Sequence, residues 1–292
     1  MKKKIVIGSR ESRLAVVQAQ TLADFINGHC PGHEAVLVTM KTSGDRILDR
    51  RLDQAGGKGL FVKELEEALF ERRVDLCVHS LKDVPMEEKE ELPLIGFTKR
   101  EDVRDVLVLP EGKTEPDRRL PIGSSSPRRI MQLRNLYPHM RTETVRGNVL
   151  TRLRKLDEGE YAALVLAAAG LNRLGLGQRI SRYFTTGEML PAGGQGILAV
   201  QGRAGEDYGW LEGFFDADAG MAAQAERGFL RELGAGCASP VAAYATVKDK
   251  VLTLWGYCDT YNGRFERESA TGSAADAEQI GIGLARYMRD GL

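Results

Sequence analysis

Short, almost wholly apolar runs alternate with amphipathic stretches along the first hundred residues. Residues 4–7, 36–40 and 74–78 have the length and composition of buried strands. The stretches that follow the first and second of these runs, residues 13–28 and about 60–73, place apolar side chains at helical spacing. Strands that alternate with helices in this way predict an α/β unit with a largely parallel sheet.

The same alternation begins again after residue 100. Strands are expected at 106–109, 121–123, 142–145 and 162–167, and helices from Pro127 and over 149–157. Pro127 suits a first helical turn, because its fixed φ is already helical and its missing N–H is not needed there. The architecture repeats without a repeated sequence motif, so we expect two α/β lobes with a cleft between them.

The last quarter of the chain has a different pattern. A helix is expected over about 221–233, strands at 241–247, 252–259 and 265–271, and a closing helix over 274–288. Asn262 and Gly263 form a strong hairpin signal between the last two strands. These elements predict a small α+β domain with a three-stranded antiparallel sheet.

Composition narrows the function. Lys and Arg together number 41, as do Asp and Glu, so the formal net charge is zero. A general nucleic-acid or anionic-membrane partner usually requires a basic surplus, and we expect neither. The apolar run at the N-terminus is too short for a signal peptide and no later run could span a bilayer, which predicts a cytoplasmic protein.

The cysteines and histidines are scattered. Cys30, Cys77, Cys237 and Cys258 form no C-x-x-C pair, and the histidines form no cluster with ligand spacing. We therefore expect free thiols, no disulfide framework and no metal.

Basic residues recur where strands are expected to turn into helices. Arg128 and Arg129 fall in the first turn of a predicted helix, Arg146 and Arg152 flank the next such turn, and Arg10 lies at the first. Cations are unfavourable at the positive end of a helix dipole unless an anion is bound there. Each arginine alone could be an ordinary surface residue, but together they predict a ligand with many carboxylates or phosphates.

Three further segments could carry chemistry. Lys58 lies in a glycine-rich loop that could expose backbone N–H groups to an anion, although it lacks the Ser or Thr of a Walker A loop and could be a flexible helix entry. Lys82 and Asp83 follow the end of a buried strand, where open α/β sheets bind ligands; the alternative is a solvated ion pair. Cys237 lies among small residues in a loop, where its sulfur could be accessible, although a lone cysteine is more often a buried apolar residue.

In combination these motifs resemble the porphobilinogen deaminase family, also called hydroxymethylbilane synthases. The matching segments, in chain order, are residues 8–15, 56–66, 78–85, 123–129, 146–153, 166–171 and 194–196. The resemblance implies a transferase that joins four porphobilinogen molecules head to tail into linear hydroxymethylbilane and releases ammonia each time. It also implies a dipyrromethane cofactor bound through a thioether to Cys237, and Asp83 as the catalytic residue.

The resemblance implies a cleft for cofactor and substrate, with Phe61 stacking on a ring. The residues that it places there are Arg10, Ser12, Lys58, Phe61, Ser80, Lys82, Ser125, Ser126, Arg128, Arg129, Arg146, Arg152, Arg173 and Gln195. The sequence departs from the family pattern at Ala235, Ala238 and Ser239 around the cysteine, and at Pro127 and Gly193.

The fold implied is α/β, with two periplasmic-binding-protein-like lobes plus a small α+β C-terminal domain. The first lobe is expected over 1–99 and 196–216, the second over 100–195, and the C-terminal domain over 217–292. An apolar strand at 197–201, which has no evident partner in the second lobe, fits this return of the chain to the first. A monomer is expected.

Other functions remain open at this point. A non-catalytic two-lobed anion-binding protein would need neither Asp83 nor Cys237. A ligand-sensing regulatory module is disfavoured, because no DNA-binding helix pair accompanies the lobes. A family member with impaired catalysis is the third alternative, given the altered cysteine loop.

Overall fold

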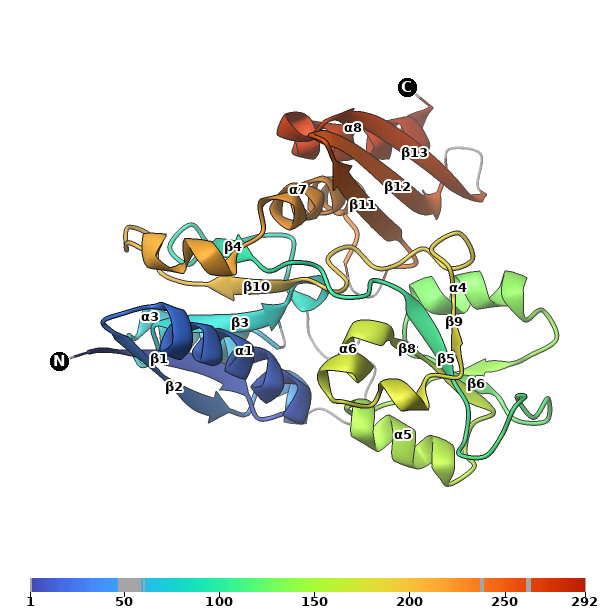
Figure 1. Ribbon diagram of the computed structural model, residues 1–292. Helices are drawn as coiled ribbons and strands as arrows, with labels where there is room; N and C mark the ends of the chain where they lie inside the picture. The colour runs from blue at the N-terminus through green and yellow to red at the C-terminus, as the bar shows by residue number, and fades with distance from the viewer. Residues whose placement is uncertain (1, 47–58, 60, 237–238, 261–263, 292) are drawn as a thin grey trace.

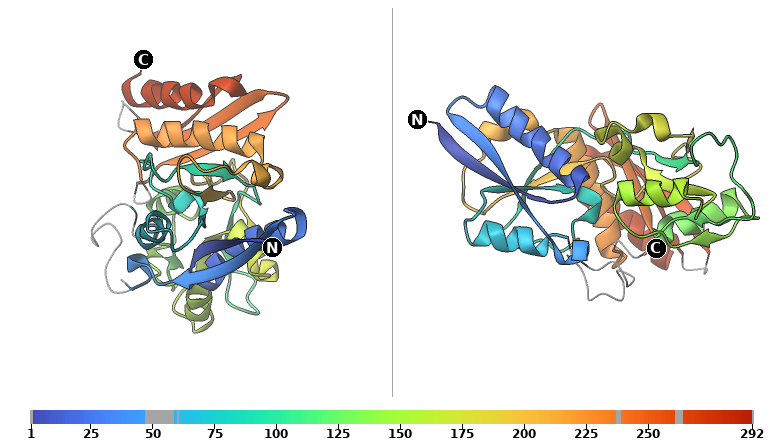
Figure 2. Two further views of the ribbon diagram at one scale, coloured as in Figure 1. Left: turned by 90° about the vertical axis from the view of Figure 1, so that its left-hand side faces the viewer. Right: turned by 90° about the horizontal axis from the view of Figure 1, so that it is seen from below.

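The computed structural model describes residues 2–46, 59, 61–236, 239–260 and 264–291, which form three sheets with helices packed against them (Figure 1). Seen from below in Figure 2, two lobes lie side by side with the C-terminal domain behind them. The α/β fold class, with its small three-stranded C-terminal sheet, is confirmed.

The first sheet has the strand order β2-β1-β3-β10-β4. Its strands are β1 (Lys3–Arg10), β2 (His33–Met40), β3 (Leu76–Ser80), β4 (Leu94–Phe97) and β10 (Leu198–Gln201). Strand β1 pairs in parallel with β2 and β3, whereas β10 runs antiparallel between β3 and β4. The helices of this lobe are α1 (Arg13–His29), α2 (Ser43–Arg46) and α3 (Lys63–Phe70). Apolar residues of α1 such as Leu22 and Ile26 pack on Ile7 and Leu76 of the sheet, which fixes α1 against it.

The second sheet has the order β7-β6-β8-β5-β9. Its strands are β5 (Asp105–Val108), β6 (Ile122–Gly123), β7 (Thr142–Glu143), β8 (Ala163–Ala167) and β9 (Arg182–Tyr183). Its helices are α4 (Pro127–Leu136), α5 (Val149–Asp157) and α6 (Ala168–Arg173). Strands β6, β7 and β8 are parallel, and β5 is antiparallel to its neighbours, so the helix starts after β6, β7 and β8 gather at one edge.

The C-terminal domain packs two helices on an antiparallel sheet. Its elements are β11 (Ala242–Lys248), β12 (Val251–Asp259), β13 (Phe265–Ser273), α7 (Ala217–Glu232) and α8 (Ala277–Asp290). The two helices can approach closely because residue 281 is glycine: a Cβ there would lie 2.2 Å from the carbonyl oxygen of Ala225. Short 3₁₀ turns complete the described structure at η1 (Leu81–Asp83), η2 (Gly177–Arg179), η3 (Gly209–Phe214) and η4 (Ala274–Asp276).

Two chain segments cross between the lobes, residues 98–104 and 184–197, and they lie against each other. The amide of Glu101 donates to the carbonyl of Gly196 at 3.1 Å. Glu226 of α7 fastens both crossings to the C-terminal domain, since its buried carboxylate accepts from the Arg100 guanidinium at 2.6 Å and from the Gly194 amide at 2.6 Å. The same carboxylate accepts from the amide of Ala245 in β11 at 2.7 Å.

Several predicted elements need correction. The helix expected over 60–73 begins at Lys63 and ends at Phe70, and the strands expected at 121–123 and 142–145 shrink to two residues each. The closing helix begins at Ala277, after a 3₁₀ turn. The predicted turn at 262–263 lies outside the described residues, although the pairing that it joins, β12 with β13, is present.

Candidate active site

A cavity of about 630 Å³ opens between the two lobes. Its basic lining residues are Arg10, Lys41, Lys82, Arg129, Arg146, Arg152 and Arg173. Its acidic lining residues are Glu11 and Asp83. A chain of zero net charge therefore concentrates cations at one place, which suits an anionic ligand.

Asp83 is the last residue of η1, which begins as soon as β3 ends. The turn is fixed from behind, because the amide of buried Leu81 donates to the carbonyl of Ile197 at 3.0 Å and the amide of Val84 donates back to Leu81 at 3.1 Å. The Asp83 side chain is exposed and lines the cavity, and none of the described basic residues forms an ion pair with it. Its carboxylate is thus held at the wall of the cavity, where a ligand can reach it.

Lys82 lies beside Asp83 and points toward the second lobe. Its Nζ donates to Oε1 of Gln195 at 3.4 Å. Burial lowers the pKa of Lys82 to about 8, against the attraction of Asp83 and with the repulsion of Arg129. Lys82 can therefore change its charge close to neutral pH.

The first lobe adds an arginine stacked on an aromatic ring. The Arg10 guanidinium lies 4.2 Å from the centroid of the Phe61 ring, and both residues line the cavity. Ser12 caps α1 by accepting from the Ala15 amide, and the Ser80 hydroxyl accepts from Gln18 at 2.8 Å. These two serines line the cavity but also hold α1 and β3 in place.

The second lobe supplies arginines held by carbonyl groups. Nε of Arg152 donates to Gly147 at 2.8 Å, and Nη2 of Arg173 donates to Gly196 at 2.7 Å. Burial, and after it the neighbouring cations Arg129 and Arg146, lower the pKa of Arg152 to about 10. Burial also lowers the pKa of Arg173. Crowded cations of this kind are unfavourable alone and become favourable once an anion lies between them.

The structure separates the two arginines that the sequence analysis paired. Arg128 is 3% exposed, donates to Asp105 at 2.5 Å and to the Leu190 carbonyl at 2.8 Å, and is not among the lining residues of the cavity. Arg129 also binds Asp105, at 2.8 Å, but reaches the cavity. Arg128 is thus a buried counterion within the second lobe.

Asp105 is the residue that the sequence analysis missed. It is fully buried at the start of β5. Burial opposes its charge, yet Arg128 and Arg129 outweigh burial and hold the pKa of Asp105 well below its usual range. The only sign in the sequence was a single acidic residue at the start of an apolar strand. Hydrophobic periodicity cannot show that this residue pairs with arginines in a helix more than twenty residues later.

Three other predicted residues are not among the lining residues of the cavity and instead make hydrogen bonds within the protein. Gln195 is fully buried and donates through Nε2 to Val103 at 2.8 Å and to Asp105 at 3.0 Å. Ser125 donates to the Val145 carbonyl at 2.5 Å, and Ser126 caps α4. Lys58 and Cys237 lie outside the described residues.

Two lining residues have roles that the sequence analysis did not assign. Lys41 follows β2 directly and lies 3.9 Å from Glu11. Asn148 caps α5 by accepting from the amide of Thr151 at 2.9 Å. Lys41 follows the end of a strand and Asn148 precedes the start of a helix, and both line the cavity. Their positions relative to these elements, more than their residue types, could have identified them.

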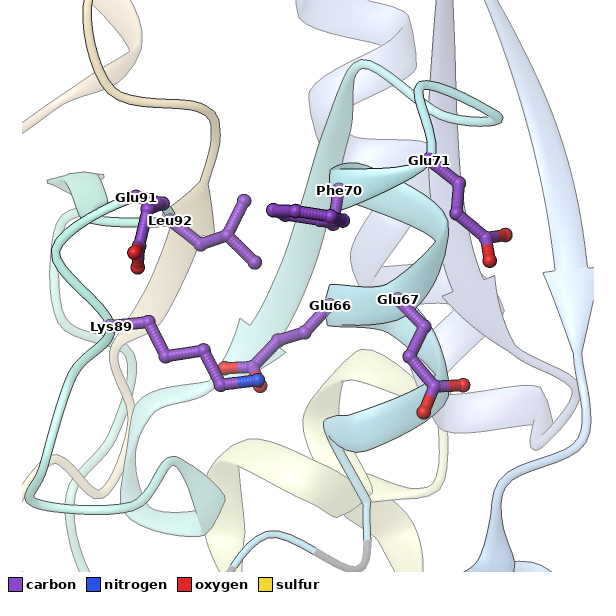
Figure 3. Close-up of a pocket in the computed structure, with 7 residues that line it drawn as sticks. All are labelled: Glu66, Glu67, Phe70, Glu71, Lys89, Glu91 and Leu92. Atoms are coloured by element: carbon purple, nitrogen blue, oxygen red, sulfur yellow. The ribbon is translucent and has the colours of Figure 1, made fainter.

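A second cavity, of about 280 Å³, lies on the outside of the first lobe and has the opposite charge (Figure 3). Its lining consists of Glu66, Glu67, Phe70, Glu71, Lys89, Glu91 and Leu92. Lys89 Nζ lies 2.8 Å from Glu66, and these two side chains meet across the cavity in Figure 3. Its carboxylates would repel an anionic ligand.

Within the residues that the structure describes, no helix is both long and apolar enough to cross a bilayer. Nor do three or more His, Cys, Asp or Glu side chains of that part of the chain gather where they could hold a metal ion.

Comparison with known proteins gives a consistent result. Residues 5–209 match the family described as "Porphobilinogen deaminase, dipyromethane cofactor binding domain", and residues 221–290 match "Porphobilinogen deaminase, C-terminal domain". A protein named porphobilinogen deaminase from Alkaliphilus oremlandii is 52% identical over 287 residues, which cover 98% of this chain and 97% of the relative. One of the same name from Ruminiclostridium cellulolyticum is 50% identical and covers 98% of both chains. Among solved structures, the second substrate-binding domain of a putative amino acid ABC transporter from Streptococcus pneumoniae aligns with a TM-score of 0.43 and 13% identity, over 77% of this chain and 96% of that one.

Proposed function

Because this chain belongs to the porphobilinogen deaminase family, we propose that Asp83 is the catalytic carboxylate of its reaction and Cys237 the attachment point of its cofactor. The chain is a hydroxymethylbilane synthase, a transferase that condenses four porphobilinogen molecules head to tail on a dipyrromethane cofactor. The observation that supports the role of Asp83 is its position as an accessible carboxylate in a cavity whose charged lining residues are mainly cations.

The cationic lining fits the substrate. Each porphobilinogen carries an acetate and a propionate, so negative charge accumulates as the product grows. Arg10, Arg146, Arg152 and Arg173 can each donate two parallel hydrogen bonds to a carboxylate, and Lys82 adds a point charge. The basic side chains therefore hold the periphery of each ring, and Asp83 is left to face the pyrrole nitrogen.

Asp83 acts on the positive charge that develops in the reaction. The bond between the aminomethyl carbon of the substrate and its protonated nitrogen breaks, the electron pair leaves with the nitrogen as ammonia, and the remaining carbon becomes electrophilic. The carboxylate of Asp83 stabilises this cation through the pyrrole N–H. A new carbon–carbon bond then forms with the free α-carbon of the acceptor pyrrole, which loses its proton to a base, and Asp83 is placed to accept it.

The residues present also fit the cofactor. A dipyrromethane has two rings with two carboxylates each, and Arg129, Arg146 and Arg173 line the cavity and are groups of the kind that bind carboxylates. When bound, the dipyrromethane supplies the pyrrole from which the product chain grows. Attachment at Cys237 is supported by the family pattern, since the cysteine and the following Pro240 are retained while Ala238 and Ser239 differ.

We further propose that the protein is a monomer in the cytoplasm and has no nucleic-acid or membrane partner. Cys30, Cys77 and Cys258 are all buried free thiols, as is usual in a reducing compartment. The zero net charge gives no electrostatic reason for a nucleic-acid partner. The three domains proposed keep the boundaries given above, at residues 99, 195 and 216.

The test compares Asp83→Asn with the wild type. We expect the variant to fold and to keep the mass excess of two pyrrole units in intact-mass spectrometry, while ammonia release falls by about 10²–10⁴-fold. Asp24→Asn is the matched control, since Asp24 is an exposed carboxylate on the outer part of α1. Near-normal turnover in Asp83→Asn would remove Asp83 from the mechanism.

Cys237→Ser tests the attachment separately. The expected result is a bare-chain mass even after incubation with porphobilinogen. A non-catalytic anion-binding protein would show no mass excess in the wild type either, and this outcome would overturn the proposed function as a whole.

A further inference from the structure

The C-terminal domain contacts the segment that immediately follows Asp83. Arg227, in the middle of α7, donates through Nη2 to the carbonyl of Pro85 at 2.7 Å and to that of Met86 at 3.3 Å. The same nitrogen pairs with Glu88 at 2.9 Å. One guanidinium nitrogen therefore holds the loop that leaves the catalytic turn at three of its residues.

Packing strengthens this contact. Met86 packs against the hydrophobic core of the C-terminal domain, which includes Phe229 and Leu230 of α7. Val84, between Asp83 and the clamped carbonyls, is buried. The backbone from Asp83 to Glu88 is thus held at both ends. The first lobe fixes η1, which ends at Asp83, and the C-terminal domain holds the chain from Pro85 onward.

The arrangement at Arg227 is not the one that stability alone would favour. Arg227 is 7% exposed, and its Nη1 is buried without a hydrogen-bond partner. Its ionic partner, Glu88, keeps 38% of its side chain exposed and so gives only partial compensation. A buried cation that is incompletely paired is often no more stabilising than an apolar residue of similar size.

We propose that Arg227 is a positioning residue for Asp83. It fixes the loop 84–88 to α7, so the domain proposed to carry the cofactor also sets the position of the catalytic carboxylate. Arg227 is not among the cavity-lining residues and acts only through the loop. The inference rests on the proposed role of Asp83.

The experiment uses the cofactor-loaded enzyme with Arg227→Gln and Arg227→Lys. We expect kcat per loaded enzyme to fall about tenfold in Arg227→Gln, because small displacements of a catalytic group are costly, with KM within about twofold because the substrate-binding arginines are untouched. Arg227→Lys should recover part of kcat, since an ammonium can still donate to one or two of the carbonyls. Amide hydrogen exchange over residues 81–92 should be faster in Arg227→Gln.

The matched control is Arg231→Gln. Arg231 lies one turn further along α7 and pairs with Glu278 in place of the loop, so its loss should leave kcat and the exchange of residues 81–92 unchanged. Wild-type kcat per loaded enzyme in Arg227→Gln would overturn the inference. If that variant fails to fold, Arg227→Lys and Glu88→Ala decide the question, and unchanged kcat in both would overturn it equally.

The same assay with Asp83→Asn separates the two proposals. An active Asp83→Asn enzyme would remove the proposed function of Asp83 and with it this inference. An inactive Asp83→Asn enzyme beside a fully active Arg227→Gln enzyme would remove only the positioning role.

Discussion

Lys82 shows how one residue can make substrate binding depend on pH. Its pKa is lowered to about 8, chiefly by burial. We expect the KM for porphobilinogen to rise as the pH passes through about 8, because the neutral amine no longer attracts a carboxylate. Initial rates measured from about pH 7 to about pH 9.5, a range that spans this pKa, test the prediction.

Lys82→Arg is the control, because arginine keeps its charge throughout this range. Its KM should vary less with pH than that of the wild type, and identical profiles would exclude Lys82 as the titrating group.

Lys82 also makes the stability of the protein depend on pH: raising the pH weakens substrate binding but increases stability. Since the pKa in the folded state is below the ordinary 10.5, Lys82 lowers the free energy of unfolding below about pH 8, and this cost disappears as the pH rises toward 10.5.

Residue chemistry was predictable where it depended on neighbours in sequence. Lys82 and Asp83 follow β3 and line the cavity, at the strand end where their sequence context indicated a ligand, and the helix expected from Pro127 begins there. The different roles of Arg128 and Arg129 were not predictable, because they depend on Asp105, which only the folded chain brings to them.

At the scale of elements, Gly194 allows the crossing segment 184–197 to pack closely against η1. Its φ is +77°, and a Cβ there would lie 2.7 Å from Cγ of Leu81 and 3.0 Å from the amide of Lys82. Gly194→Ala should therefore displace the turn that carries Asp83 and lower both stability and kcat. We expect a loss in the free energy of unfolding of about 1–2 kcal/mol from the backbone conformation alone, and more from the clash.

Gly205→Ala isolates the backbone effect. Gly205 has the same φ of +77°, but a Cβ there meets nothing within 4 Å. Urea denaturation should show a smaller loss for this variant, and kcat should not change. Equal losses in the free energy of unfolding of the two variants would show that a clash between residue 194 and η1 does not affect stability.

Long elements with a clear period were predicted well, and very short ones were not. The helix α5 has the bounds expected for it, 149–157. Strands β4 and β9 were absent from the prediction: β9 has two residues, too few to show any period, and β4 has a glycine among its four. Both are strands because neighbouring strands supply hydrogen bonds to them, which is information from the tertiary structure.

At the scale of the whole molecule, the charge distribution predicts how salt acts. The net charge is zero, so salt should affect the enzyme mainly where cations are concentrated, in the cavity between the lobes. The Debye length falls from about 10 Å at 0.1 M salt to about 3 Å at 1 M. We expect the KM for porphobilinogen to rise over this range, while kcat at saturation changes little.

Two arginines of α5 provide the comparison. Arg152 lines the cavity, whereas Arg154 is exposed and pairs with Glu158. The slope of log KM against log salt should be smaller in Arg152→Gln than in the wild type and unchanged in Arg154→Gln. Equal slopes in all three proteins would mean that Arg152 does not bind the substrate electrostatically.

The assembly of the lobes was accessible only in part from the residue pattern. The pattern indicated two α/β lobes and an isolated apolar strand near residue 200, and the family resemblance supplied its destination. The position of β10 between β3 and β4 is decided by pairing between residues more than a hundred positions apart, such as Ala199 with His79. The anchoring of both crossings by Glu226 has no signal in the sequence.

The place of β10 in the first sheet has a consequence for synthesis on the ribosome. The chain emerges from its N-terminus, so the first sheet lacks β10 until Gln201 has been made, after all five strands of the second sheet. The second lobe can therefore complete its sheet while β3 and β4 still present open edges. Nascent chains of this protein should need protection from aggregation during that interval, although the exposed strands belong to the part that was translated first.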